Sequence, residues 1–206
     1  MGKNNLGPVT PEKIASDLAA FKKCFDNAKI PWIIMGGIVL GYARYKKIME
    51  WDTDVDVAVF VELKPKQRQI LNQSLQANGF KIGKNKSDFL CGGREAPCNI
   101  WFFHKNGDYC EAFPKSTPGL KFVEKSMWYE KPQIVDFLDN KYPMPNHMED
   151  YLVCQYGLDW MTNVVKDHEQ YYLDKRGTRN VSEWPAGRAT KGGDMWPKIL
   201  KIGDKM

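Results

Sequence analysis

Three alternating carboxylates follow a glycine pair in residues 33–57, which read IIMGGIVLGYARYKKIMEWDTDVDV. The acids are Asp52, Asp54 and Asp56, and in an extended strand residues two apart point to the same face. Branched apolar residues alternate with the acids, which favours a strand. Carboxylates crowded on one face repel one another unless a cation or protons compensate. The segment therefore predicts a strand with an acidic cluster, and Mg²⁺ suits such a cluster because one or two carboxylates plus substrate phosphates usually hold it.

The glycine pair, Gly36 and Gly37, comes just before a short expected helix at 38–45. Glycine lets the backbone approach a ligand closely, and its free amide N–H groups can then cradle a phosphate. Arg44 lies near the end of the same helix, and its planar guanidinium suits a diphosphate. The segment thus predicts a phosphate-binding turn next to the acidic cluster.

This arrangement resembles the nucleotidyltransferase superfamily, in which Gly-Gly or Gly-Ser and a short helix precede Asp-apolar-Asp-apolar on a strand. Within that superfamily it looks like the LicD/fukutin family of phosphotransferases, with Gly-Gly-Thr-Leu-Leu-Gly, an Arg, and Ile-Pro-Trp-Asp-Asp-Asp-Ile-Asp. The chain departs from this pattern at Ile38, Met49-Glu50 and Thr53, none of which removes an expected metal ligand. Residues 135–160 look like the family's closing motif of Pro, Asn, a Tyr-Leu pair and Tyr-Gly-x-x-Trp/Tyr.

The resemblance covers roughly residues 30–160 and implies an α+β, nucleotidyltransferase-like fold, with a small mixed β-sheet carrying the acidic cluster and helices packed against it. It also implies a metal-dependent enzyme, a phosphotransferase that moves a phosphocholine-like group from a CDP-alcohol donor to a hydroxyl acceptor such as a glycan. The implied catalytic residues, which would also hold Mg²⁺ or Mn²⁺, are Asp54, Asp56 and Glu111. The implied substrate-binding residues are Gly36, Gly37, Arg44, Trp51 and Asp52.

The third carboxylate of this superfamily usually comes from a neighbouring strand. Residues 107–114, GDYCEAFP, resemble the family's Gly-x-x-x-Asp-Ile-Phe-Pro, with Glu111 in the Asp position. Glutamate reaches one methylene further than aspartate, so it could still contact a metal ion or a water molecule. Asp108 is the alternative, and both residues could instead be ordinary acids of a hairpin.

Two other functions stay open from the sequence. One is transfer of a nucleoside monophosphate from a triphosphate to a small molecule or nucleic acid, and the other is a non-catalytic pseudoenzyme that binds nucleotides. A choline-type donor would need aromatic faces within about 6 Å of its ammonium group. Trp51 and Tyr42 lie near the expected phosphate site in sequence, and Trp101 or Trp160 could complete such a cage. Core packing is the alternative role for all four.

Composition limits the remaining possibilities. The chain has 206 residues, 43% apolar and 27% charged, which predicts one domain at 1–173 followed by a basic, Gly- and Pro-containing tail at 174–206. The net charge of +5 fits an anionic substrate and does not exclude nucleic acid, although no reading motif is present. The longest apolar stretch is too short to span a membrane. Five cysteines without a signal peptide predict a cytoplasmic protein with reduced thiols, and the oligomeric state stays open.

Three cysteines and a histidine could be imagined as a zinc site, but their spacings fit no standard finger, so structural zinc is not expected. These residues are Cys91, Cys98, His104 and Cys110.

Apolar periodicity, caps and turn residues predict the other elements. Helices are expected from 11 to before 31, at 67–78 and at 148–156, and extended segments at 32–35, 54–61, 99–104, 108–113, 122–123 and 133–137.

Overall fold

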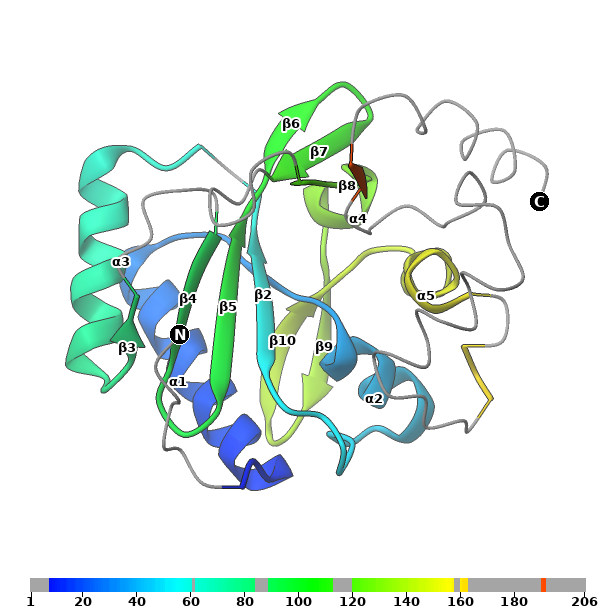
Figure 1. Ribbon diagram of the computed structural model, residues 1–206, viewed down its shortest axis with the longest axis horizontal. Helices are drawn as coiled ribbons and strands as arrows, with labels where there is room; N and C mark the ends of the chain where they lie inside the picture. Colours follow the sequence, from blue (N-terminus) through cyan, green and yellow to red (C-terminus); the bar gives the residue numbers. More distant parts are fainter. Residues whose placement is uncertain are drawn as a thin grey trace.

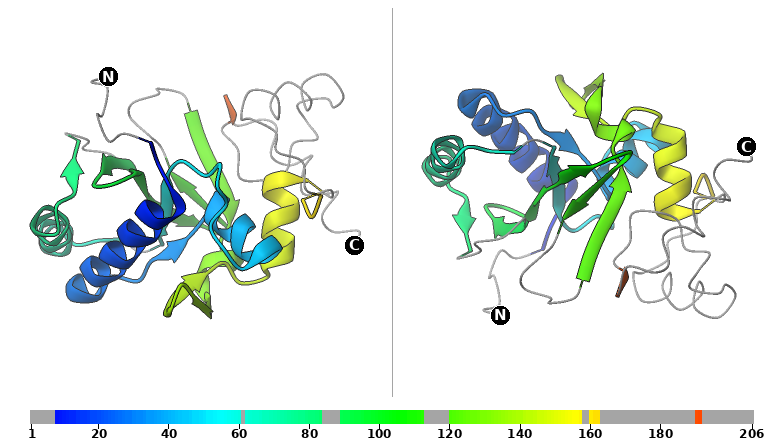
Figure 2. Two further views of the ribbon diagram at one scale, coloured as in Figure 1. Left: turned by 90° about the horizontal axis from the view of Figure 1, so that it is seen from below. Right: turned by 90° about the horizontal axis from the view of Figure 1, so that it is seen from above.

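The computed structural model describes residues 8–60, 62–83, 89–112, 120–157, 160–162 and 190–191. A five-stranded sheet runs through the centre of the molecule (Figure 1). Helices α1 and α3 lie toward one edge of this sheet, whereas α2, α5 and the hairpin of β9 and β10 lie toward the other (Figure 1). The two views of Figure 2 keep α1 close to α3, and α2 close to α5. The expected α+β architecture, with a small mixed sheet and packed helices, is confirmed.

The strand order of the central sheet is β1-β2-β5-β4-β3. Strands β2 and β5 are parallel, and every other pair is antiparallel. Strands β2 and β5 contain valine, isoleucine and aromatic residues, which are typical of strands, and alternate side chains of β5 are buried. The bounds are Ile33–Ile34 for β1, Val55–Val59 for β2, Lys81–Ile82 for β3, Phe89–Gly93 for β4 and Pro97–Phe102 for β5.

Helix α1 begins where its cap predicts. The Thr10 hydroxyl oxygen accepts a hydrogen bond from the Lys13 N–H at 3.4 Å, and proline occupies the first turn. One apolar face of the helix is buried, including Phe21 and Phe25, and Phe25 stacks on Trp32 with ring centroids 5.2 Å apart. The helices are α1 Pro11–Ala28, α2 Gly37–Tyr45, α3 Pro65–Ala77, α4 Met127–Glu130 and α5 Met148–Tyr156.

The expected hairpin of 99–104 and 108–113 needs correction. Residues up to Phe102 belong to β5 of the central sheet, because they pair with β2 and bury alternate side chains in the core. Only β6, His104–Asn106, pairs with β7, Tyr109–Ala112, around the turn at Gly107. Strand β8, Leu120–Lys125, pairs with β7, and β11, Thr190–Lys191, pairs with β8.

Strands β9, Gln133–Phe137, and β10, Asn140–Met144, form a separate antiparallel hairpin next to β1. No helix within the described ranges is both long enough and apolar enough to cross a membrane. The expected boundary at residue 173 lies outside the described residues, as does the tail at 174–206 apart from the short strand β11.

Candidate active site

The acidic cluster lies where the chain enters β2. Asp52 and Asp54 precede the strand, and Asp56 is its second residue. The backbone N–H of Met35, just before the glycine pair, donates a hydrogen bond to the Asp56 carbonyl oxygen at 3.0 Å. Antiparallel pairing of β1 with β2 therefore carries the glycine turn to the acidic end of β2.

Each glycine of the turn lies against one carboxylate. A Cβ atom added to Gly36 would lie 3.2 Å from Asp56 Oδ2, and one added to Gly37 would lie 2.7 Å from Asp52 Oδ2. Gly36 also has a φ of +68°, which side chains other than glycine rarely adopt. The glycine pair thus has a role that the sequence did not reveal, because it lets the turn and the acidic cluster pack directly together.

Tyr151 reaches this turn from α5. Its hydroxyl oxygen accepts a hydrogen bond from the Gly36 N–H at 2.9 Å, and the tyrosine is fully buried. Sequence reasoning placed Tyr151 in the closing motif without giving it a role at the site. Its place in the Tyr-Leu pair of that motif was the only signal, and it says nothing about a contact 115 residues away.

Burial and mutual repulsion hold protons on this cluster. The pKa of Asp52 rises to about 7, first because its carboxyl group is buried and then because Asp54 and Asp56 lie close by. Its Oδ1 atom accepts the Thr53 N–H at 3.1 Å, whereas its buried Oδ2 atom has no hydrogen-bond partner within the described part of the chain. Burial also raises the pKa of Asp54. Such a cluster favours either protons or a cation.

Two side chains of the neighbouring strand β5 contact the aspartates. Asn99 lies opposite Asp56 in the parallel register, and its Nδ2 atom is 2.9 Å from Asp56 Oδ1 and 3.3 Å from Asp54 Oδ2. The indole nitrogen of Trp101 donates to Asp56 Oδ1 at 3.4 Å. Asp54 and Asp56 therefore converge on one amide nitrogen. Asn99 is not among the residues expected from the sequence, because its place at the site depends on which strand pairs with β2.

Glu111, the expected third carboxylate, lies on β7 in the other sheet. There it pairs in register with His104, and its side chain accepts a hydrogen bond from Asn106 at 3.1 Å. Residue 104 follows Asn99 by five positions, a distance of up to about 16 Å in extended chain. Figure 1 shows β6 and β7 beyond the end of β5, whereas Asn99 lies near its start. Asp108 is exposed in the same hairpin turn. The structure therefore does not bring either acid to the aspartate pair.

The other expected binding residues lie around α2. Arg44 is in the last turn of this helix, and its Nε atom donates to the backbone carbonyl of Trp160. Trp51 is 42% exposed next to the acidic cluster in sequence. Tyr42 packs edge-on against Phe137 with centroids 5.4 Å apart, and the Lys46 ammonium lies 3.7 Å from the centre of its ring. The Lys46 ammonium group therefore already covers the face of the Tyr42 ring in this structure.

The site suits a cation held by few protein ligands. Within the described ranges, no three His, Cys, Asp or Glu side chains converge as a ready-made metal cage. Mg²⁺ needs only one or two carboxylates when substrate phosphates supply the rest. Asp54 and Asp56, which converge on one amide nitrogen, would supply these carboxylates. Of the imagined zinc ligands, Cys98 and Cys110 are buried in different sheets, and the side chain of Cys91 lies outside the described part.

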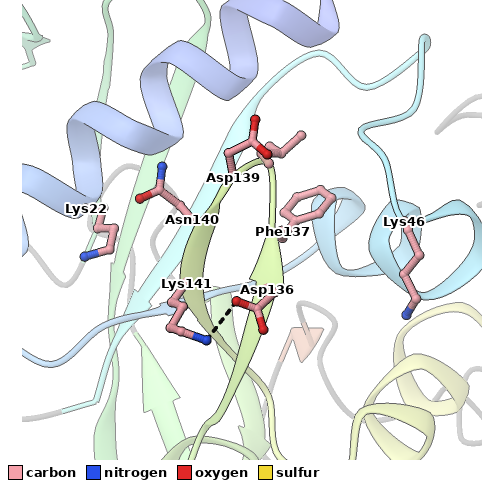
Figure 3. Close-up of a pocket in the computed structure, with 8 residues that line it drawn as sticks. Lys22, Lys46, Asp136, Phe137, Asp139, Asn140 and Lys141 are labelled. Carbon is pink, nitrogen blue, oxygen red and sulfur yellow. Dashed lines mark hydrogen bonds and ion pairs between the residues drawn. The ribbon is translucent and has the colours of Figure 1, made fainter.

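A separate open pocket of about 820 Å³ lies at the tip of the β9–β10 hairpin. Figure 3 shows Lys46 projecting from the end of α2, Lys22 on α1, and Asp136 paired with Lys141 across the two strands. The aspartates of the acidic cluster are not among its lining residues, which are Lys22, Lys46, Asp136, Phe137, Leu138, Asp139, Asn140 and Lys141.

Most of this site lies within a segment of the chain that matches a known protein family. Residues 29–147, more than half of the chain, match the family described as LicD/FKTN/FKRP, nucleotidyltransferase domain. The chain belongs to the LicD/FKTN/FKRP family. This match contains β1, the glycine turn, the acidic cluster and Asn99, and it confirms the resemblance to this family over residues 29–147.

Among relatives, an uncharacterised protein of Rickettsia typhi is 35% identical to this LicD-family chain over 79 residues. The match covers 38% of this chain and a quarter of the length of that curated relative. The solution structure of the antibiotic-resistance factor ANT(2'')-Ia is similar with a TM-score of 0.51 and 12% identity, over 82% of this chain and 86% of that one. At this identity the similarity shows the fold alone. A crystal structure of ANT(2'')-Ia with adenylyl-2''-tobramycin has a TM-score of 0.48 and 12% identity, covering 80% and 89% of the two chains.

Proposed function

We propose that this LicD-family chain is a metal-dependent phosphotransferase that moves a phosphocholine-like group from a CDP-alcohol to a hydroxyl acceptor such as a glycan. The observation that carries the proposal is the crowding of Asp52, Asp54 and Asp56 against the Gly36–Gly37 turn. Buried acids of this density are costly without a compensating charge. A donor diphosphate together with a divalent cation fits this need.

In the proposed reaction, the acceptor oxygen bonds to the β-phosphorus of the donor while the bond from that phosphorus to the CMP oxygen breaks. CMP leaves with the bridging oxygen, and the acceptor proton passes to a carboxylate of the cluster. Mg²⁺ or Mn²⁺ held by Asp54 and Asp56 would neutralise the negative charge of the diphosphate. The free N–H groups of the first turn of α2, which begins at Gly37, would bind phosphate oxygens. We expect the exposed Trp51 to contact the donor.

Nucleotidyl transfer from a nucleoside triphosphate is a second candidate, favoured by the family's description as a nucleotidyltransferase domain. Its products would be pyrophosphate and a nucleotide-modified acceptor, whereas the proposed reaction releases CMP. A nucleotide-binding protein without turnover is a third candidate. It is favoured by the neutral side chain of Asn99 beside the aspartate pair.

A thermal-shift screen of CMP, CDP-choline, CDP-ribitol and nucleoside triphosphates, with and without Mg²⁺, tests the proposal. Because a ligand that binds only the folded state raises the melting temperature, a CDP-alcohol with Mg²⁺ should give the largest increase. Incubation of the best ligand with candidate glycans, followed by ³¹P NMR, should then show CMP.

The matched variants are Asp56→Asn, which should abolish the Mg²⁺-dependent shift, and Asp139→Asn, which should leave it unchanged. Asp139 is an acid of the β9–β10 turn, outside the acidic cluster. Absence of a shift with every cytidine nucleotide would contradict the proposed donor. Pyrophosphate release from a triphosphate would replace the proposal with the second candidate.

A further inference from the structure

A side-chain amide, and not a carboxylate, faces the aspartate pair from β5. The parallel register places Asn99 opposite Asp56, and one Nδ2 atom lies within hydrogen-bond distance of both Asp54 and Asp56. Ionised carboxylates only accept hydrogen bonds, so the NH₂ end of the amide is the end that must face them. The amide thus donates to both acids at once.

The register between β2 and β5 fixes which side chains of β5 face the aspartates. Alternate residues of β5 point to opposite faces, and Cys98, Ile100 and Phe102 are buried in the core. The opposite face carries Asn99 and Trp101, both half-buried, and both are neutral donors to Asp56. A residue at position 99 cannot turn away from the acids without shifting the strand by one residue, which would expose the buried face.

Asn99 bridges Asp54 and Asp56, whereas the Oδ1 atom of Asp52 accepts the Thr53 N–H at 3.1 Å. The Asp52 carboxylate lies against Gly37, where a Cβ atom would be 2.7 Å from Oδ2 and 2.8 Å from Oδ1. The pair of carboxylates that converges on β5 therefore carries at most two negative charges. One divalent cation balances these two charges, and β5, which contains neither Asp nor Glu, adds no carboxylate that could hold a second.

We propose that Asn99 is a positioning residue that bridges Asp54 and Asp56 in the metal-free protein and limits the cluster to one divalent cation. The cation itself rests on the proposed function. Amide donors and a cation compete for the same carboxylate lone pairs, so the identity of residue 99 sets both the metal-free stability and the metal affinity. An aspartate at this position would supply the missing charged ligand and remove the bridging donor.

The test measures Mg²⁺ and Mn²⁺ binding by isothermal titration, and melting temperature with EDTA or with metal, in wild type and Asn99→Asp. We expect one cation per wild-type chain. In Asn99→Asp we expect a metal-free melting temperature several degrees lower and a metal dissociation constant at least tenfold lower. Gln73→Glu is the charge-matched control, because it adds the same negative charge on an exposed position of α3 and should change neither quantity.

Asn99→Leu separates the effect of losing the two hydrogen bonds from the effect of adding a charged ligand. It removes both hydrogen bonds without adding a ligand, so it should lower the metal-free melting temperature without the gain in affinity. Two cations bound per wild-type chain, or Asn99→Asp with wild-type affinity and melting temperature, would overturn the inference while leaving metal-dependent transfer intact. Metal binding by Asn99→Asp alone would overturn the one-cation limit together with the metal-dependent function. Absence of binding in both proteins would overturn both.

Discussion

The hydroxyl oxygen of Tyr151 lies 2.9 Å from the backbone nitrogen of Gly36 and accepts its hydrogen bond. This contact joins α5 to the turn between β1 and α2, next to the acidic cluster. It also means that the Gly36 N–H already has a partner within the protein. Phosphate binding by the turn would therefore depend on the N–H groups that follow, from Gly37 onward.

Tyr151→Phe should destabilise the fold by about 1–3 kcal/mol, because it leaves the partly buried Gly36 N–H without its acceptor. Urea unfolding followed by circular dichroism measures the change in the free energy of unfolding. Tyr129→Phe is the matched control, because the buried Tyr129 hydroxyl has no hydrogen-bond partner in the described part of the chain. Its removal should be neutral or stabilising. Equal losses in the two variants would show that the Gly36 contact contributes nothing specific.

Gly37→Ala should displace the Asp52 carboxylate, since the new Cβ atom would lie 2.7 Å from its Oδ2 atom. We expect a cost of about 1–3 kcal/mol for this overpacking. The double variant Gly37→Ala/Asp52→Ala removes the crowded atoms, so its cost should be clearly smaller than the sum of the two single costs. Denaturant unfolding of all four proteins gives this coupling. Strictly additive changes in the free energy of unfolding would mean that Gly37 and the Asp52 carboxylate do not interact.

Stability of the metal-free protein should fall as pH rises from about 4 to about 7 and change little above that pH. The folded-state pKa of Asp52 is about 7, raised by burial, whereas the ordinary value is 3.8. The folded state therefore keeps a proton that the unfolded state has already lost, and this advantage disappears once pH exceeds about 7. The loss should be on the order of 1 kcal/mol per pH unit within this window. Unfolding in EDTA at several pH values measures it, and Asp52→Asn should flatten the profile. An unchanged profile in that variant would assign the pH dependence to other groups.

Asp17→Asn should weaken the support of β5. Asp17 on α1 is fully buried, and its Oδ2 atom accepts the N–H groups of Ala96 at 2.9 Å and Glu95 at 3.0 Å. Its Oδ1 atom lies 3.1 Å from Arg94 Nε. Asparagine cannot accept from the two N–H groups and pair with the guanidinium at once, and Arg94 keeps its contact with Glu95, so we expect a cost of about 1–3 kcal/mol.

The control for Asp17 is Asp26→Asn on the same helix, where an exposed pair with Lys22 should contribute less than about 1 kcal/mol. Chemical unfolding compares the two variants. Similar small losses in both would mean that the buried carboxylate does not fix the turn before β5.

Local patterns in the sequence predicted several parts of this protein correctly. The Thr10 cap and the apolar face of residues 11–28 predicted α1, because capping and helical periodicity involve residues only a few positions apart. The Gly-Gly turn, the helix behind it and the alternating aspartates identified the family and the position of β2 for the same reason. The turn, its helix and the aspartates lie within one stretch of 25 residues, 33–57.

Tertiary structure decided the contacts between distant segments. Whether Asn99 or Glu111 lies beside Asp56 depends on the parallel pairing of β2 with β5, which no local pattern specifies. The same holds for Tyr151, which reaches Gly36 only because α5 packs near α2. The sequence by itself determined the acidic strand and its glycine turn, since period and turn chemistry are local. The packing of the core selected the strand and helix that complete the site, because burial of apolar faces sets register across the whole chain.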